Sequence, residues 1–101
     1  MKPRIPIEPG RVVMSRAGRD AGRGLLVLAM ADAEHALVAD GRLRTVVKPK
    51  RKKLRHLVAR PTCAQDIARR YAQGAQILDA EIRSVLEQAG VEQPNALSKE
   101  G

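Results

Sequence analysis

The chain has 101 residues with 19 Lys and Arg against 11 Asp and Glu, a formal net charge of +8 that is typical of polyanion-binding proteins rather than of enzymes acting on neutral substrates. Its length limits it to about one small domain, whose core is aliphatic because Tyr71 is the only aromatic residue. The single cysteine, Cys63, excludes an intrachain disulfide, and no apolar run approaches the roughly 20 residues of a membrane helix, so we expect a soluble, cytoplasmic protein.

The first sixty residues predict short strands. Residues 1–9 contain three prolines and are expected to form an extended lead-in. The expected strands are residues 11–16, 24–30, 35–39, 43–47 and 54–58, with Asp40-Gly41 as a two-residue hairpin turn between the third and the fourth. The second of these strands is apolar on both faces, which is typical of a central strand. Five strands at this spacing predict a small barrel over residues 10–60.

After Pro61 the apolar residues recur with helical spacing. Two helices are expected within residues 61–90, ended by Gly74 and Gly90, with Thr62 and Gln65 as a capping box for the first helix and Asp79 as the N-cap of the second. The apolar positions are Ala64, Ile67, Ala68 and Tyr71 in the first helix and Ile82, Val85, Leu86 and Ala89 in the second. These stripes are expected to cover the barrel or each other, with partner binding as the less common alternative. Residues 91–101 are expected to form a flexible tail.

The turn between the first two strands combines glycines with arginines. We expect Gly18, Gly22 and Gly24 to shape this loop and Arg16, Arg19 and Arg23 to bind phosphates, because guanidinium groups match phosphate oxygens bidentately. An ordinary flexible β-turn is the alternative. Asp20 is expected to order the bend through Asx-type hydrogen bonding, with a direct role as the alternative.

The positive charge is concentrated in the first part of the chain. Residues 1–60 hold 15 Lys and Arg against 5 Asp and Glu, whereas residues 61–101 hold 4 against 6. The densest run, KPKRKKLRH at residues 48–56, has no acidic residue and is expected to connect the fourth and fifth strands. A solvated charged loop is the simpler interpretation, but contact with a polyanion explains better why so many like charges lie next to one another. The further candidates for RNA binding are Arg42, Arg44, Lys48, Lys50, Arg51, Lys52, Lys53, Arg55 and His56.

The residues carry a family resemblance. GRVVMSRAGRDAGRGLLVLAM, residues 10–30, is similar to the KOW motif of ribosomal proteins and transcription elongation factors. The order continues with VADGRLR, the basic run, LRHL and Pro-Thr, which resembles short KOW-domain RNA-binding proteins related to a large-subunit ribosomal protein of archaea and eukaryotes. The resemblance implies an SH3-like (KOW) barrel that contacts RNA. Together with the strand and helix patterns, it predicts a mainly β fold: a five-stranded SH3-like (KOW) barrel followed by two short helices.

No catalytic pattern is recognisable, and the scattered His35, His56 and Cys63 do not suggest a closed zinc site, so neither an enzyme nor a cofactor is expected. We expect a protein that contacts the phosphates of structured RNA, with ribosomal RNA as the first candidate, in a ribosomal or ribosome-associated role in translation. Ribosomal proteins are candidate partners. The alternatives are a protein-interaction or transcription-elongation-type KOW module that docks on polymerase or another ribosomal component, and binding to DNA.

Overall fold

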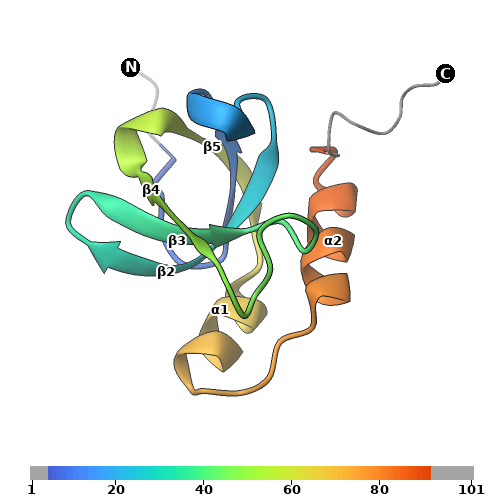
Figure 1. Cartoon of the computed structure of the whole chain (residues 1–101). Coiled ribbons are helices and arrows are strands. Elements are labelled where there is room, and N and C mark those ends of the chain that lie inside the picture. The colour runs from blue at the N-terminus through green and yellow to red at the C-terminus, as the bar shows by residue number, and fades with distance from the viewer. Residues whose placement is uncertain (1–4, 92–101) are drawn as a thin grey trace, which may run out of the picture.

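The computed structural model describes residues 5–91, which form a five-stranded antiparallel sheet followed by two helices (Figure 1). In chain order the elements are β1 (Arg11–Ser15), the 3₁₀ turn η1 (Gly18–Asp20), β2 (Gly24–Asp32), β3 (His35–Ala39), β4 (Lys50–Lys53), the 3₁₀ turn η2 (Leu54–His56), β5 (Leu57–Cys63), α1 (Gln65–Ala72) and α2 (Asp79–Gln88). The strand order is β4-β3-β2-β1-β5, and within residues 5–91 no ladder joins β4 to β5. The expected β domain with two helices after it is confirmed, but the sheet is open, so the expected closed barrel is not shown.

Strand β2 lies in the middle of the sheet, as its apolar pattern predicts. Leu26 and Leu28 belong to the hydrophobic cluster on one face, and Leu25 and Val27 belong to the cluster on the other. All four side chains are buried, and each contributes roughly 1.5 to 3 kcal/mol to folding relative to an exposed position. A strand that is apolar on both faces is typical of the middle of a sheet, and β2 lies there.

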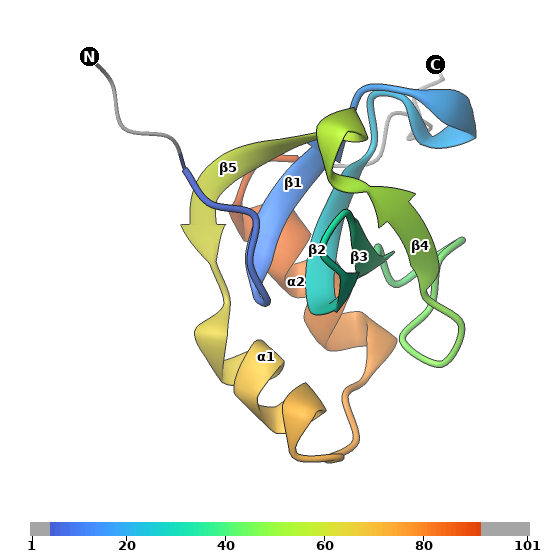
Figure 2. The same cartoon turned by 90° about the vertical axis from the view of Figure 1, so that its left-hand side faces the viewer.

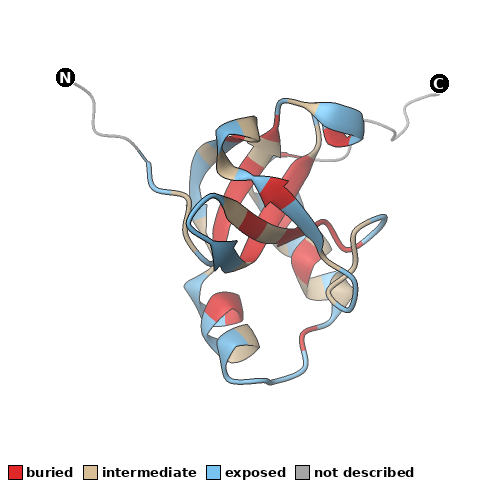
Figure 3. Ribbon diagram, turned by 60° about the vertical axis from the view of Figure 1, so that its left-hand side comes forward, coloured by how far each residue is buried: buried red, intermediate tan, exposed pale blue. Residues whose placement is uncertain are grey.

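The two helices cover one face of the sheet (Figures 1 and 2). Ile67 of α1 and Ile82 and Leu86 of α2 pack in one cluster with Val12 and Leu26 of the sheet. Figure 3 shows the buried residues along the strands and on the inward sides of the helices. The helices are therefore part of the domain core, and the expectation that their apolar stripes cover the sheet is confirmed.

The other face is enclosed by the curvature of the sheet itself. Val13, Val38 and Leu57 come from three different strands and pack in one cluster there. The β1–β5 and β2–β3 ladders contain register shifts, and such bulges increase the local bend of a strand. Curvature thus replaces a second layer on this side.

The expected hairpin at Asp40-Gly41 and the expected strand over residues 43–47 are both wrong. Residues 40–49 form a loop, and β4 is instead Lys50–Lys53, inside the basic run that was expected to be a connection. The reason is that side chains bind the backbone amides of this segment. Asp40 Oδ1 accepts hydrogen bonds from the amides of Arg42 (2.8 Å) and Arg44 (2.9 Å). In addition, the amide of Val46 donates to Asp79 Oδ1 at 2.8 Å. These amides are no longer available to a strand ladder.

The expected fifth strand over residues 54–58 is displaced along the chain. Residues 54–56 form the η2 turn, and β5 continues to Cys63, through Pro61. Because β5 is an edge strand, a proline without an N–H group is tolerated there.

The helices end at the predicted glycines, but their N-terminal caps differ from the prediction. Gly74 (φ +81°) and Gly90 (φ +76°) follow α1 and α2 in the left-handed conformation that ends a helix. Thr62 lies in β5 and caps nothing, since α1 begins at Gln65 without a side-chain cap. Asp79 is the first residue of α2, and the preceding amide of Leu78 is instead bound by Glu81 Oε2 at 3.1 Å.

The ends of the chain are described only in part. Residues 5–9, the described portion of the expected lead-in, contain no strand or helix, and Val91 is buried in the core. The remainder of the expected tail, residues 92–101, lies outside the described residues. Between residues 5 and 91 there is no helix with the length and apolar character needed to cross a membrane.

Candidate nucleic-acid interface

The loop between β1 and β2, residues 16–23, is called the glycine loop and is closed by backbone hydrogen bonds. Gly18 and Gly22 adopt positive φ values of 76° and 86°. Backbone bonds from Gly22 N to Ser15 O (2.8 Å) and from Arg23 N to Asp20 O (2.8 Å) tie its two sides together. The loop-shaping roles of Gly18 and Gly22 thus have a structural basis, and the bend is an ordered one.

Gly24 has a different role from the other two glycines. It is the first residue of β2, pairs with Met14, and does not have a positive φ. A Cβ atom built on it would lie 2.5 Å from the carbonyl oxygen of Val91. Gly24 is therefore required for the approach of the segment after α2 rather than for the shape of the loop.

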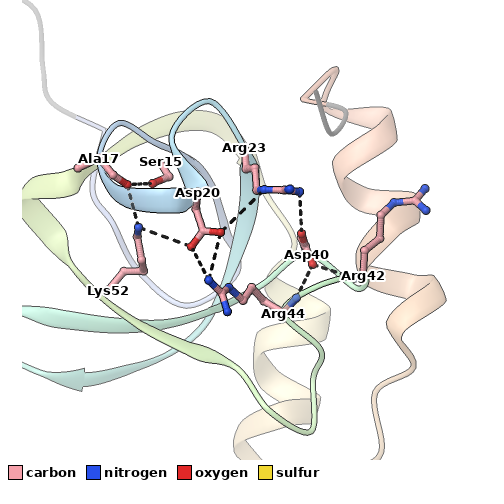
Figure 4. Close-up of polar contacts among 8 residues, drawn as sticks. All are labelled: Ser15, Ala17, Asp20, Arg23, Asp40, Arg42, Arg44 and Lys52. Carbon is pink, nitrogen blue, oxygen red and sulfur yellow. Dashed lines mark hydrogen bonds and ion pairs between the residues drawn. The ribbon is translucent and has the colours of Figure 1, made fainter. Parts of the chain in front are cut away.

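Asp20 is the electrostatic centre of the loop (Figure 4). Its carboxylate is buried and receives three cations from different parts of the chain. Arg44 Nη2 lies 3.3 Å from Oδ2, Lys52 Nζ lies 3.7 Å from Oδ2, and Arg23 Nε lies 3.9 Å from Oδ1. Asp20 thus orders the loop through ion pairs, which sequence reasoning missed because two of the partners come from after residue 40.

A second buried acid, Asp40, continues this network. Its Oδ2 atom lies 3.9 Å from Arg23 Nη1. The amide of Arg42 donates to Asp40 Oδ1, but the guanidinium group of Arg42 points away from the acids (Figure 4). Asp20 and Asp40 together therefore hold the glycine loop against the start of the 40–49 loop.

Lys52 joins the basic strand to the glycine loop. Its side chain is buried, and its ammonium group donates to the carbonyl oxygen of Ala17 at 3.1 Å besides pairing with Asp20. A side chain in this position is shielded from a macromolecular ligand. The sequence does not reveal that Lys52 is buried, because the neighbouring residues of the basic run have the same charge.

The structure divides the predicted RNA-binding cations into two groups. Four are paired with carboxylates: Arg23, Arg44 and Lys52 with Asp20, and Arg51 with Asp32, where Arg51 Nη2 lies 2.6 Å from Oδ2. The others are exposed, and their side chains form no ion pair within the part of the chain that the structure describes. These unpaired cations are Arg16, Arg19, Arg42, Lys48, Lys50, Lys53 and Arg55.

The glycine loop, η2 and the end of β4 lie side by side. The amide of Arg16 donates to the carbonyl oxygen of His56 at 2.9 Å, and Lys52 bridges β4 to Ala17. Figure 2 shows the loop in blue and η2 in yellow-green together at the top, with β4 beside them. The glycine loop and the basic run, which are distant in sequence, thus contribute to one surface.

Arg42 and Lys48 are placed elsewhere. They belong to the 40–49 loop, which enters β4 at the end opposite η2. This loop is fastened to α2 by a 2.7 Å bond from Arg83 Nη1 to the carbonyl oxygen of Gly41. The predicted set of cations is therefore not a single patch.

His56 is surrounded by the cations of this surface. Partial burial lowers the pKa of its imidazole below the usual value, and the positive charges of Arg55, Lys53, Lys52 and Arg16 lower this pKa further. The imidazole is thus held neutral near pH 7. These four cations come from β4, η2 and the glycine loop.

An open hollow of about 440 Å³ lies beside β4. Its lining is entirely basic and consists of His35, Lys50, Arg51, Lys52, Lys53 and His56. His35, which the sequence did not mark as an RNA-binding candidate, faces Lys53 across the β3–β4 ladder and bonds through Nδ1 to Asp32 Oδ1 at 2.9 Å. The antiparallel register could have suggested this neighbour only if β4 had been predicted correctly.

Among residues 5–91 there is no group of three or more His, Cys, Asp or Glu arranged to hold a metal ion. Cys63 is the last residue of β5, and burial raises the pKa of its thiol, which opposes the formation of a reactive thiolate. A comparison of the chain with protein-family models finds no match.

Proposed function

We propose that the protein binds structured RNA through its phosphates, with ribosomal RNA as the first candidate, and acts in the cytoplasm as a ribosomal or ribosome-associated protein in translation. The observation that carries the proposal is the convergence of unpaired cations from the glycine loop, η2 and β4 on one surface. Exposed cations kept this close repel one another, and a polyanion removes that repulsion. Phosphate contacts of this kind position a protein on a nucleic acid without reading its sequence.

The lack of aromatic residues favours folded RNA over single strands. Proteins that bind single strands stack bases on aromatic side chains, each worth roughly 1 to 3 kcal/mol. Tyr71 is the only aromatic residue of the chain and packs against the core cluster from α1. Readout of backbone shape therefore suits this surface better than base stacking.

We infer further that the sheet is a divergent SH3-like domain of the KOW type. The order of strand, glycine loop and strand over residues 10–30 supports this inference, as do the five antiparallel strands and their curvature. In this interpretation the loop that carries Arg16 and Arg19 is the RNA-facing loop.

Salt dependence tests the proposal directly. Binding of the full chain to a short RNA duplex, followed by fluorescence anisotropy, should weaken steeply with salt. The expected log–log slope is about −0.9 for each phosphate neutralised, if the duplex behaves like B-DNA. A slope near zero would contradict the proposal. Competition by duplex DNA at equal salt distinguishes RNA binding from general duplex binding.

A matched pair of variants locates the contact. Arg55→Ala removes an unpaired arginine from η2, whereas Arg69→Ala removes an exposed arginine from α1 that pairs with Asp66. The first should weaken binding several-fold and make the slope less steep by about 0.9, and the second should change neither. Lys52 is unsuitable for such a test because its replacement disturbs the buried ion pairs.

A protein-docking function, on polymerase or a ribosomal component, is favoured by one separate feature. Leu43 and Val47 are 64% and 86% exposed, although the 40–49 loop is tightly hydrogen-bonded. Val47→Asp should leave duplex RNA binding unchanged under the main proposal. If it abolishes binding to purified ribosomal subunits while Arg55→Ala does not, the docking function is the better one.

A further inference from the structure

The hollow beside β4 differs from the rest of the basic surface because both histidines of the chain line it. Four of its lining residues come from β4, His35 comes from β3 and His56 comes from η2. Two acids that lie outside the lining pair with lining residues: Asp32 with His35 and Arg51, and Asp20 with Lys52. The hollow therefore presents donors without presenting a carboxylate.

Three of its side chains have no polar partner. Lys50, Lys53 and His56 make no side-chain hydrogen bond or ion pair within residues 5–91. Two ammonium groups and an imidazole supply several N–H donors to a tetrahedral anion once the imidazole is protonated. A single phosphate group, whose negative oxygens can bind different donors, suits such a set.

We propose that this hollow is a phosphate-binding pocket in which His56 takes up a proton when the phosphate enters, so that binding is coupled to protonation. The natural ligand of the pocket would be a phosphodiester of the RNA backbone, and in this respect the proposal rests on the proposed RNA-binding function. The proton comes from solvent and forms an N–H bond on the imidazole that lasts while the phosphate is bound, and no bond of the phosphate forms or breaks.

The charges around His56 give the direction of this coupling. From β4 it faces Lys52 and Lys53, from η2 Arg55 and from the glycine loop Arg16, and all of them disfavour the imidazolium form. His35 and Lys50 line the same hollow, and Asp32 lies behind His35. A bound phosphate adds negative charge beside the ring and reverses the balance, which favours protonation. By linkage, affinity must then rise as pH falls toward the range in which His56 titrates.

The histidine can be observed directly in the full chain. We would follow the imidazole signals of His56 and His35 by NMR from pH 5.5 to 8 at constant ionic strength. The titration is done on the protein alone, on the protein with a short RNA duplex, and on the protein with sulfate, an anion that does not itself titrate in this range. The pKa of His56 should rise by about one unit with either ligand, which corresponds to about tenfold tighter binding at low pH than at high pH. His56→Gln should abolish this pH dependence, whereas Arg69→Ala should keep it.

The outcomes separate the pocket from the proposed function. If RNA binds but the pKa of His56 and the affinity stay independent of the ligand and of pH, the pocket is refuted and RNA binding stands. If sulfate raises the pKa of His56 but RNA does not bind, the pocket stands and the RNA function is refuted. If neither ligand binds, both are refuted.

Discussion

The ammonium group of Lys52 lies 3.7 Å from Oδ2 of the buried Asp20, so that a residue from the middle of the basic run completes the interior of the glycine loop. Arg44 and Arg23 approach the same carboxylate. The surface proposed to bind RNA therefore stands on an internal ion-pair network, and its cations differ in role although they are alike in sequence.

Asp20→Asn should destabilise the protein strongly. Removing one partner from a buried ion pair leaves charge uncompensated and costs about 3 to 5 kcal/mol, which urea denaturation would measure as a fall in the free energy of unfolding. Asp66→Asn is the matched control, because Asp66 is exposed and pairs with Arg69 and Arg70 along α1. Its cost should stay below about 1 kcal/mol. Equal effects of the two variants would show that the buried network contributes little.

Gly24→Ala and Gly22→Ala should destabilise for different reasons. At Gly24 a Cβ would lie 2.6 Å from the Cγ2 atom of the buried Val91, so we expect about 1 to 3 kcal/mol from overpacking. At Gly22 nothing lies within 4 Å of a Cβ, but φ is +86°, which costs an alanine roughly 1 to 2 kcal/mol. Hydrogen exchange distinguishes them, since only Gly24→Ala should reduce protection of the Val91 amide, which bonds to the carbonyl oxygen of Leu86.

A fragment that ends after residue 63 should fail to fold cooperatively. It keeps all five strands but exposes Val12, Leu26 and Leu28, which the helices cover. Circular dichroism during urea titration should show no sharp transition, whereas the full chain should show one. Ile82→Ala tests the same packing in the intact chain and should cost about 2 to 5 kcal/mol. A sharp transition of the fragment at the midpoint of the full chain would contradict this prediction.

The ion pair between Arg70 of α1 and Glu81 of α2 should lose its stabilising effect at acidic pH. Hydrogen bonding to Arg70, together with the amide of Leu78, lowers the pKa of Glu81 below its usual value of about 4.5. A carboxylate with a lowered pKa stabilises the fold at pH values above 4.5, and this stabilisation is lost as pH falls through the lowered value. The melting temperature of Glu81→Gln should therefore be below that of the original chain at pH 7. The two melting temperatures should converge as pH falls below 4.5 through the lowered pKa of Glu81, and a constant difference would contradict the assignment.

The features that local pattern predicted correctly are those that depend on neighbours in sequence. The two apolar faces of β2 are typical of a central strand, and Gly74 and Gly90 end the helices because glycine tolerates positive φ. The expected strand over residues 43–47 failed because Asp40 binds amides within its own turn and Asp79, from α2, binds the amide of Val46. The second of these bonds exists only after the helix has packed against the sheet.

By itself, the sequence determined that the protein is a small β domain with two helices after it, strongly basic in its first sixty residues and provided with a glycine loop of positive φ. Hydrophobic spacing and net charge are properties of the chain, and they survive any detail of packing. Only the tertiary structure decided which cations remain available. Ion pairs to Asp20 and Asp32 depend on distances of a few ångströms between segments that are remote in sequence, and no local pattern contains those distances.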